Sequence, residues 1–195
     1  MVDWVLSLAQ RQIATLPSNA EGKAAVPEVR GGFGRADNLV LFLTASTTDK
    51  GAGVLPPLRG TAEVMLRSRR QRAACFDQSE NATAQDNLDQ GGLVARIQPG
   101  GWIGFDRIRL QDFTRIKLSG WPQGNAPLKV RIFAGEQELA QQDLPPGPAA
   151  SRQPTDFIFP MPPASTDAAP QQVRLQLDAP AASVLDVMWV EFLRQ

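Results

Sequence analysis

Histidine and tyrosine are absent from the 195 residues, and cysteine occurs once, as Cys75. The absence of histidine excludes Ser-His and Cys-His catalysis, imidazole-ligated zinc and histidine-ligated haem. A single cysteine excludes a disulfide within the chain, and an apolar neighbourhood favours an inert, buried thiol over a nucleophile. These absences, and the lack of an evident pair of buried carboxylates, indicate that the chain is not an enzyme.

A net charge is also lacking, because 20 Lys and Arg balance 20 Asp and Glu. A neutral chain has no broad field for nucleic acid or an anionic membrane, so we expect neither as a partner. The basic cluster at 67–72 has two interpretations, a solvated strand end or a polyanion site, and we favour the first. No run of 18 apolar residues is present, which predicts no membrane span, and the N-terminus does not resemble a signal peptide.

The N-terminal part differs in composition from the rest. Residues 2–13 place apolar side chains near one face of a helix, so we predict a short amphipathic helix there. Residues 17–37 are rich in Pro, Gly, Ala and charge, which predicts a linker or irregular arm. The polar stretch 77–92 is interpreted as a hydrated, turn-rich loop rather than as a metal or acid/base cluster.

From residue 38 onward, short apolar or alternating segments are separated by Gly, Pro and Asp clusters. Strict alternation in "KVRIF" and "VRLQL" is typical of half-buried antiparallel strands. The predicted strands are 38–46, 61–68, 92–97, 101–105, 113–120, 127–135, 137–144, 155–161, 171–179 and 183–193. Their number and spacing predict an all-β fold, an antiparallel β-sandwich of jelly-roll type, with the short N-terminal helix and the arm attached.

Three segments in order carry a resemblance to a known family: "GGLVARIQPGGWIGFDRIRL", "LKVRIFAGEQELAQQDLP" and the final "DVMWVEF". They resemble family 6 carbohydrate-binding modules, which have a galactose-binding-like jelly roll, over about residues 66–194. "LVLFLTASTTDKGAGVLPPLRGTAEVMLRS" resembles the segment that precedes this module in modular bacterial secreted proteins. "MVDWVLSLA" resembles the last helix of a cytochrome c domain, in proteins that also carry a sugar dehydrogenase-like domain.

The resemblance implies three regions: an N-terminal helix and arm at 1–37, a connecting β segment at 38–68, and the module at 69–195. It implies an extracellular or periplasmic parent protein whose preceding domains are partners of this one. It also implies a calcium site, but Arg72 and Ala74 replace the two usual glutamates. Because an arginine cannot replace a carboxylate ligand, we expect no metal and no cofactor.

Tryptophan and amide side chains are the candidate sugar contacts. Trp102 and Trp189 stand in alternating apolar runs, so we expect both rings in the core, with glycines turning the chain beside Trp102. Trp121 follows Ser119-Gly120 and precedes Pro122, which predicts a loop, where the ring is either a plug or ligand-facing. The predicted carbohydrate-binding residues are Trp121, Asn125, Asn87, Gln90 and Asp186, of which Asp186 matches the family's loop asparagine.

Two functions remain open from the sequence. The first is a non-catalytic module that binds a polysaccharide or glycan within a secreted oxidoreductase-like protein. The second is a structural or docking β-sandwich whose sugar site has been lost. The loop 145–154 carries no aromatic side chain, although the family places a ring there, and this favours the second function.

Overall fold

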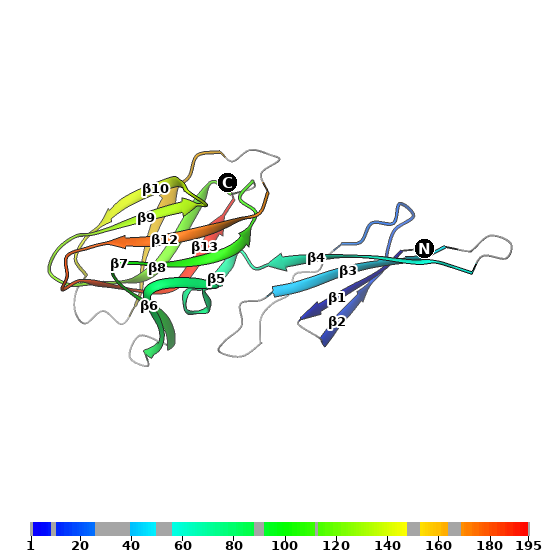
Figure 1. Ribbon diagram of the computed structural model, residues 1–195, viewed down its shortest axis with the longest axis horizontal. Helices are drawn as coiled ribbons and strands as arrows, with labels where there is room; N and C mark the ends of the chain where they lie inside the picture. The colour runs from blue at the N-terminus through cyan, green and yellow to red at the C-terminus, as the bar shows by residue number, and fades with distance from the viewer. Residues whose placement is uncertain are drawn as a thin grey trace. The chain divides into compact units, whose positions relative to one another are not determined.

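The computed structural model describes residues 2–8, 11–25, 40–49, 56–87, 92–111, 113–147, 153–163 and 169–194. It is almost entirely built of antiparallel strands, so the all-β prediction is confirmed (Figure 1). The chain forms two compact units, Met1–Ser68 and Arg69–Gln195. None of the described residues form a helix that is both long enough and apolar enough to cross a membrane.

The first unit is a four-stranded antiparallel sheet in the order β2-β1-β3-β4. Its strands are β1 (Val2–Leu8), β2 (Arg11–Leu16), β3 (Val40–Thr48) and β4 (Arg59–Arg67). The helix predicted at 2–13 is therefore wrong, and its residues form the β1-β2 hairpin. Trp4 and Leu6 lie on one face of β1, where Leu6 is fully buried, and β1 pairs with β3 along its whole length. A short helix alone in water has no such partner.

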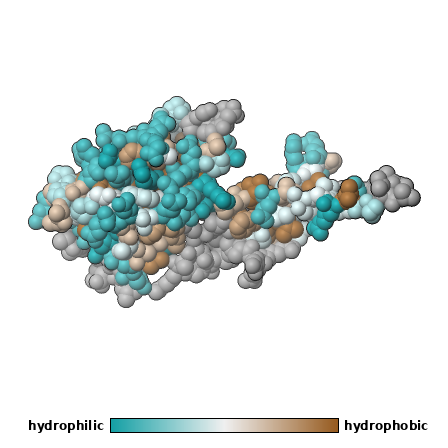
Figure 2. Space-filling model, in the orientation of Figure 1, coloured by the Kyte–Doolittle hydropathy of each residue, from teal (hydrophilic) through white to brown (hydrophobic). Residues whose placement is uncertain are grey.

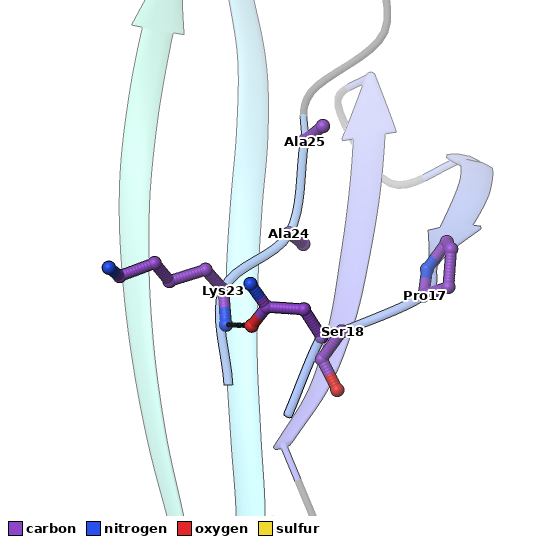
Figure 3. A pocket seen from close by; sticks show the side chains of 6 residues that line it. Pro17, Ser18, Lys23, Ala24 and Ala25 are labelled. Carbon is purple, nitrogen blue, oxygen red and sulfur yellow. Dashed lines mark hydrogen bonds between the residues drawn. The ribbon is translucent and has the colours of Figure 1, made fainter. Parts of the chain in front are cut away.

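Residues 17–25 of the predicted arm are ordered against this sheet. The indole Nε1 of Trp4 donates a hydrogen bond to the carbonyl oxygen of Gly22 at 2.9 Å, and the side chain of Asn19 accepts from the backbone N–H of Lys23 at 2.8 Å. Figure 3 shows the open hollow beside this turn. The hollow is lined by Pro17, Ser18, Asn19, Lys23, Ala24 and Ala25, and the only charged side chain in it belongs to Lys23, which pairs with Glu21.

The second unit is the β-sandwich. Its strands follow the path β10-β9-β12-β7-β13-β8-β11, with β6 paired to β7 and β5 paired to β13. The elements are β5 (Arg70–Arg72), the 3₁₀ turn η1 (Ala73–Cys75), β6 (Gln78–Asn87), β7 (Gly92–Ile108), β8 (Arg115–Gln123), β9 (Leu128–Ala134), β10 (Gln137–Leu144), β11 (Thr155–Pro160), β12 (Gln171–Asp178) and β13 (Val184–Leu193).

The long strand β7 belongs to both layers of the sandwich. Its first part, Leu93–Ile97, pairs with β6 and β13, and its second part, from Trp102 onward, pairs with β6 and β12. The predicted strands 92–97 and 101–105 are thus one strand with a bend between them. Gly100, with a φ of +74°, and Gly101 stand at the bend.

Strand β6 overturns the prediction of a loop at 77–92. Its side chains are mostly polar and exposed, so no apolar alternation marks it, and its backbone is held by the partner strand β7. The core lies between the layers and is made of alternate residues of the strands, including the fully buried Phe105, Phe159 and Phe192. Polar side chains occupy most of the visible surface of the second unit (Figure 2).

Candidate functional site

Trp121 and Asp186 do not lie where the sequence placed them. Trp121 belongs to β8 rather than to a loop, and only 4% of it is exposed. Asp186 is opposite Trp121 in β13 and is fully buried. Neither side chain offers a surface to a ligand, because Trp121 is covered and the carboxylate of Asp186 already accepts hydrogen bonds inside the protein.

The partner of Asp186 is Arg96, directly opposite it in β7. Arg96 Nε and one terminal nitrogen donate to the two carboxylate oxygens at 2.7 Å each, and the Gln123 amide donates to the same carboxylate. The hydrogen bonds of Arg96 to Asp186 raise the pKa of the Arg96 guanidinium. The arrangement is a bidentate, charge-assisted pair, in which the aspartate is buried and the arginine is 30% exposed. Asp186 thus holds the side chains of Arg96 and Gln123 in place.

The remaining predicted sugar contacts are placed as follows. Asn125 is exposed in the turn at 124–126 after β8. Asn87 is the last residue of β6, but its side chain lies outside the described part of the chain, and so does all of Gln90. The structure therefore brings no group of these five residues together into a described site.

Trp102 lies on the outer surface, contrary to the prediction that it fills the core. Ile103 and Phe105 are fully buried, so Trp102, which alternates with them, points to the opposite side of β7. It is half-buried there, and its Nε1 donates to the carboxylate of Glu80, opposite it in β6, at 3.0 Å. The register places Gln176 of β12 on its other side. A row of Glu80, Trp102 and Gln176 thus crosses three neighbouring strands.

The indole of Trp102 lies beside the backbone of Gly104. A Cβ atom added at Gly104 meets the Cζ3 atom of Trp102 at 3.1 Å, so glycine provides the space for the ring. Arg174, opposite Gly104 in β12, places its guanidinium carbon 5.6 Å from the centroid of the Trp102 ring and 4.8 Å from that of Phe133. Both distances are within the range of cation–π attraction. The guanidinium is thereby fixed between two aromatic rings.

Hydrogen-bonding side chains surround these rings. Asp106 accepts from the amides of Gln78, at 3.1 Å, and Gln172, at 2.9 Å. Arg131 Nε lies 2.8 Å from a carboxylate oxygen of Asp178. We name this surface the Trp102 face and define it as Gln78, Glu80, Trp102, Asp106, Arg131, Gln172, Arg174, Gln176 and Asp178.

The Trp102 face is close to electrically neutral. It contains two arginines and three carboxylates. In the ion pair of Arg131 with Asp178, each side chain is about a third exposed. Amides, carboxylates and guanidinium groups in alternation both donate and accept hydrogen bonds, which suits a ligand rich in hydroxyls. The half-buried indole of Trp102 supplies a flat apolar surface in the same place. These groups together suit a ligand that is rich in hydroxyls and also has an apolar side.

Trp189 is also outside the core, contrary to the prediction, and it lies in the other layer of the sandwich, on the strand β13. It is half-buried in β13, and the guanidinium carbons of Arg70 and Arg72 lie 4.3 and 4.5 Å from its ring centroid. Nearby, Lys117 lies 2.9 Å from Glu191, and this hydrogen bond raises the pKa of Lys117. Two of the residues in the basic cluster 67–72 are thus stacked on an indole. Trp189 is more closely covered by cations than Trp102 is.

No family model and no curated protein matches the sequence. The fold, however, is that of family 6 carbohydrate-binding modules. The module of Clostridium cellulolyticum in complex with xylose has a TM-score of 0.55 at 10% identity, covering 64% of this chain and 96% of the other. A β-1,3-glucan-binding module of Bacillus halodurans has a TM-score of 0.51 at 18% identity, covering 64% and 95%. CsCBM6-3 of Clostridium stercorarium, in complex with cellobiose, has a TM-score of 0.50 at 16% identity, covering 65% and 93%.

Proposed function

We propose that the second unit is a non-catalytic carbohydrate-binding module and that its ligand, a neutral polysaccharide, lies on the Trp102 face. The observation that carries the proposal is the partly exposed indole of Trp102, held by Glu80 and flanked by Gln176 and Arg174 on adjacent strands. An aromatic ring bordered by donors and acceptors binds a sugar by contact with its C–H face and by hydrogen bonds to its hydroxyls. Charge balance on the face favours a neutral glycan over an anionic one.

Two further observations support this assignment. The three structural neighbours named above are carbohydrate-binding modules, described with xylose, β-1,3-glucan and cellobiose respectively. The extended, strand-borne face of this chain suits a polymer that runs across several strands. The resemblance of the sequence to the C-terminal region of secreted, oxidoreductase-like modular proteins supports an extracellular setting, in which the module holds its parent protein on a polysaccharide.

Trp102→Ala tests the proposal. We expect the substitution to weaken binding to soluble glucans or xylan by roughly tenfold or more, because a buried aromatic contact carries much of the energy of such an interface. Affinity gel electrophoresis and calorimetry against a panel of soluble polysaccharides measure it. Trp189→Ala is the matched control, because it removes another half-buried indole, which lies in the other layer of the sandwich. Equal loss in both variants, or unchanged binding by Trp102→Ala, contradicts the assignment of the face.

A structural or docking module is the second candidate function, and one observation favours it. The position that the resemblance assigns to a sugar-binding asparagine is Asp186, which is fully buried in the pair with Arg96, beside a covered Trp121. On this alternative the sandwich packs against neighbouring domains and binds no sugar. Absence of retardation of the unmodified protein by every polysaccharide in the panel supports the alternative and refutes the first proposal.

A further inference from the structure

Strand β4 is an open edge of the four-stranded sheet. Among the described residues it pairs only with β3, and all six residues from Arg59 to Val64 are exposed. Two of the three exposed large apolar side chains in the described part of the chain stand here, Leu58 at 70% and Val64 at 55%. An exposed, regular and partly apolar edge is a template for another strand. The opposite edge strand, β2, carries a bulge in its pairing with β1 and is shorter.

Along β4, the backbone N–H and C=O groups of successive residues point alternately toward β3 and toward the open edge. Asp49 donates its N–H to the carbonyl of Leu58 at 3.0 Å, so Leu58 is bonded toward β3. Because the direction of N–H and C=O alternates along a strand, Arg59, Thr61 and Glu63 direct theirs outward. The same three side chains lie on one face of the sheet. On that face, Arg59 donates to the hydroxyl of Ser46 at 3.4 Å, and Glu63 accepts from the hydroxyl of Thr44 at 3.3 Å.

We propose that two copies of this chain associate through β4, edge to edge and antiparallel, with Thr61 opposite Thr61 of the second copy. In this register each Arg59 stands opposite Glu63, and each Leu58 stands opposite Val64. All three outward-directed residues of one copy then meet outward-directed residues of the other, so their backbone N–H and C=O groups can pair in a continuous hydrogen-bond ladder. The two sheets become one continuous sheet of eight strands.

Charge complementarity selects this register. Centring the contact on Glu63 sets that carboxylate against itself and sets Arg59 against Arg67, and like charges directly opposite each other destabilise a strand pair. Centring it on Met65 pairs Glu63 with Arg67, but it carries Leu58 beyond the partner's β4 and leaves this side chain exposed. Only the register centred on Thr61 pairs opposite charges and covers both exposed apolar side chains.

A dimer of this kind has a consequence for binding. It carries two copies of the sandwich, so two polysaccharide-binding faces act on one polymer, and the second binding event becomes intramolecular. The dimer itself rests only on Leu58 and the residues of β4, and it does not depend on the proposed function. Its test is therefore made without any glycan.

The first experiment is cysteine cross-linking in the full chain with Cys75→Ser, which removes the native thiol. Thr61→Cys places two thiols in a hydrogen-bonded antiparallel pair, where the Cα atoms are about 5.5 Å apart, within the range for a disulfide. We expect oxidation to give a covalent dimer for Thr61→Cys and none for Met65→Cys. A dimer with Met65→Cys alone overturns the register, and a dimer with neither overturns the proposal.

The second experiment measures the monomer–dimer equilibrium by sedimentation. We expect Arg59→Glu to weaken the dimer about tenfold, because it sets like charges opposite each other twice, and we expect Glu63→Arg in the same chain to restore it. Arg67→Glu, on the same strand but outside the charge pairs, is the matched control and leaves the dimer unchanged. Circular dichroism checks that each variant is folded. A wild-type chain that sediments as a monomer at every concentration refutes the dimer.

Discussion

Substitution of Gly101 by alanine is expected to lower the free energy of unfolding by at least about 3 kcal/mol, which is the upper part of the range for overpacking. A Cβ atom at this position meets three backbone carbonyl oxygens, those of Asn81 at 2.5 Å and of Gln98 and Glu80 at 2.9 Å. Backbone atoms cannot turn aside as a flexible side chain can, so strands β6 and β7 must separate at the bend.

Gly100→Ala is the matched control for Gly101→Ala. Gly100 has a φ of +74°, but a Cβ atom there meets nothing within 4 Å. Alanine therefore costs only the strain of the left-handed conformation, about 1–2 kcal/mol. Chemical denaturation measures both variants. A smaller loss of stability for Gly101→Ala than for Gly100→Ala contradicts the crowding at the bend. Because Trp102 directly follows Gly101, we also expect Gly101→Ala to weaken glycan binding.

The second large effect is expected from Arg96→Met, at about 3–5 kcal/mol of unfolding free energy. Arg96 is the charged partner of the fully buried Asp186, and without it the carboxylate keeps only the Gln123 amide among the hydrogen bonds described above. An uncompensated buried charge, rather than a lost attraction, causes the loss. Asp186→Leu in the same chain removes that charge, and we expect it to recover most of the stability.

Arg131→Met is the matched control for Arg96→Met. Arg131 also pairs with carboxylates on neighbouring strands, Asp178 at 2.8 Å and Glu138 at 3.8 Å, but each of these partners is more than a third exposed. Loss of such a surface pair costs about 0–1 kcal/mol, because water replaces the partner. Thermal and chemical unfolding rank the variants. Equal effects of Arg96→Met and Arg131→Met show that burial of Asp186 does not set the cost.

Much of the sandwich was predictable from local pattern. Strands such as β9 and β12 alternate strictly, and segments with that alternation are strands with their apolar residues in the core. Strand β10 matches its predicted bounds. The first hairpin was not predictable in this way, because the apolar residues of 2–13 fit a helical face as well as a strand face. Pairing of β1 with β3, more than 30 residues later, decided between them.

The candidate site shows where reasoning from residue type alone fails. The apolar run around Trp102 predicts a core position for the ring, although the alternation of residues along the same run predicts the opposite side of the strand. Ile103 and Phe105 share one side of β7, which leaves Trp102 and Gly104 on the other. Trp121 was assigned to a loop because of the Gly and Pro beside it, yet β8 continues through Pro122 to Gln123. Its burial depends on neighbours that are distant in sequence.

The amino-acid sequence by itself determined the class of this protein: an all-β chain, neutral, without histidine, and with alternating strands whose order resembles a carbohydrate-binding jelly roll. Only the tertiary structure decided which ring faces outward and which carboxylate is buried. The physical reason is that alternation assigns residues to the two sides of a strand, whereas burial on either side depends on what packs there. Asp186 and Trp102 both lie on outward-facing sides, and their neighbours on adjacent strands bury the first completely and the second only in part.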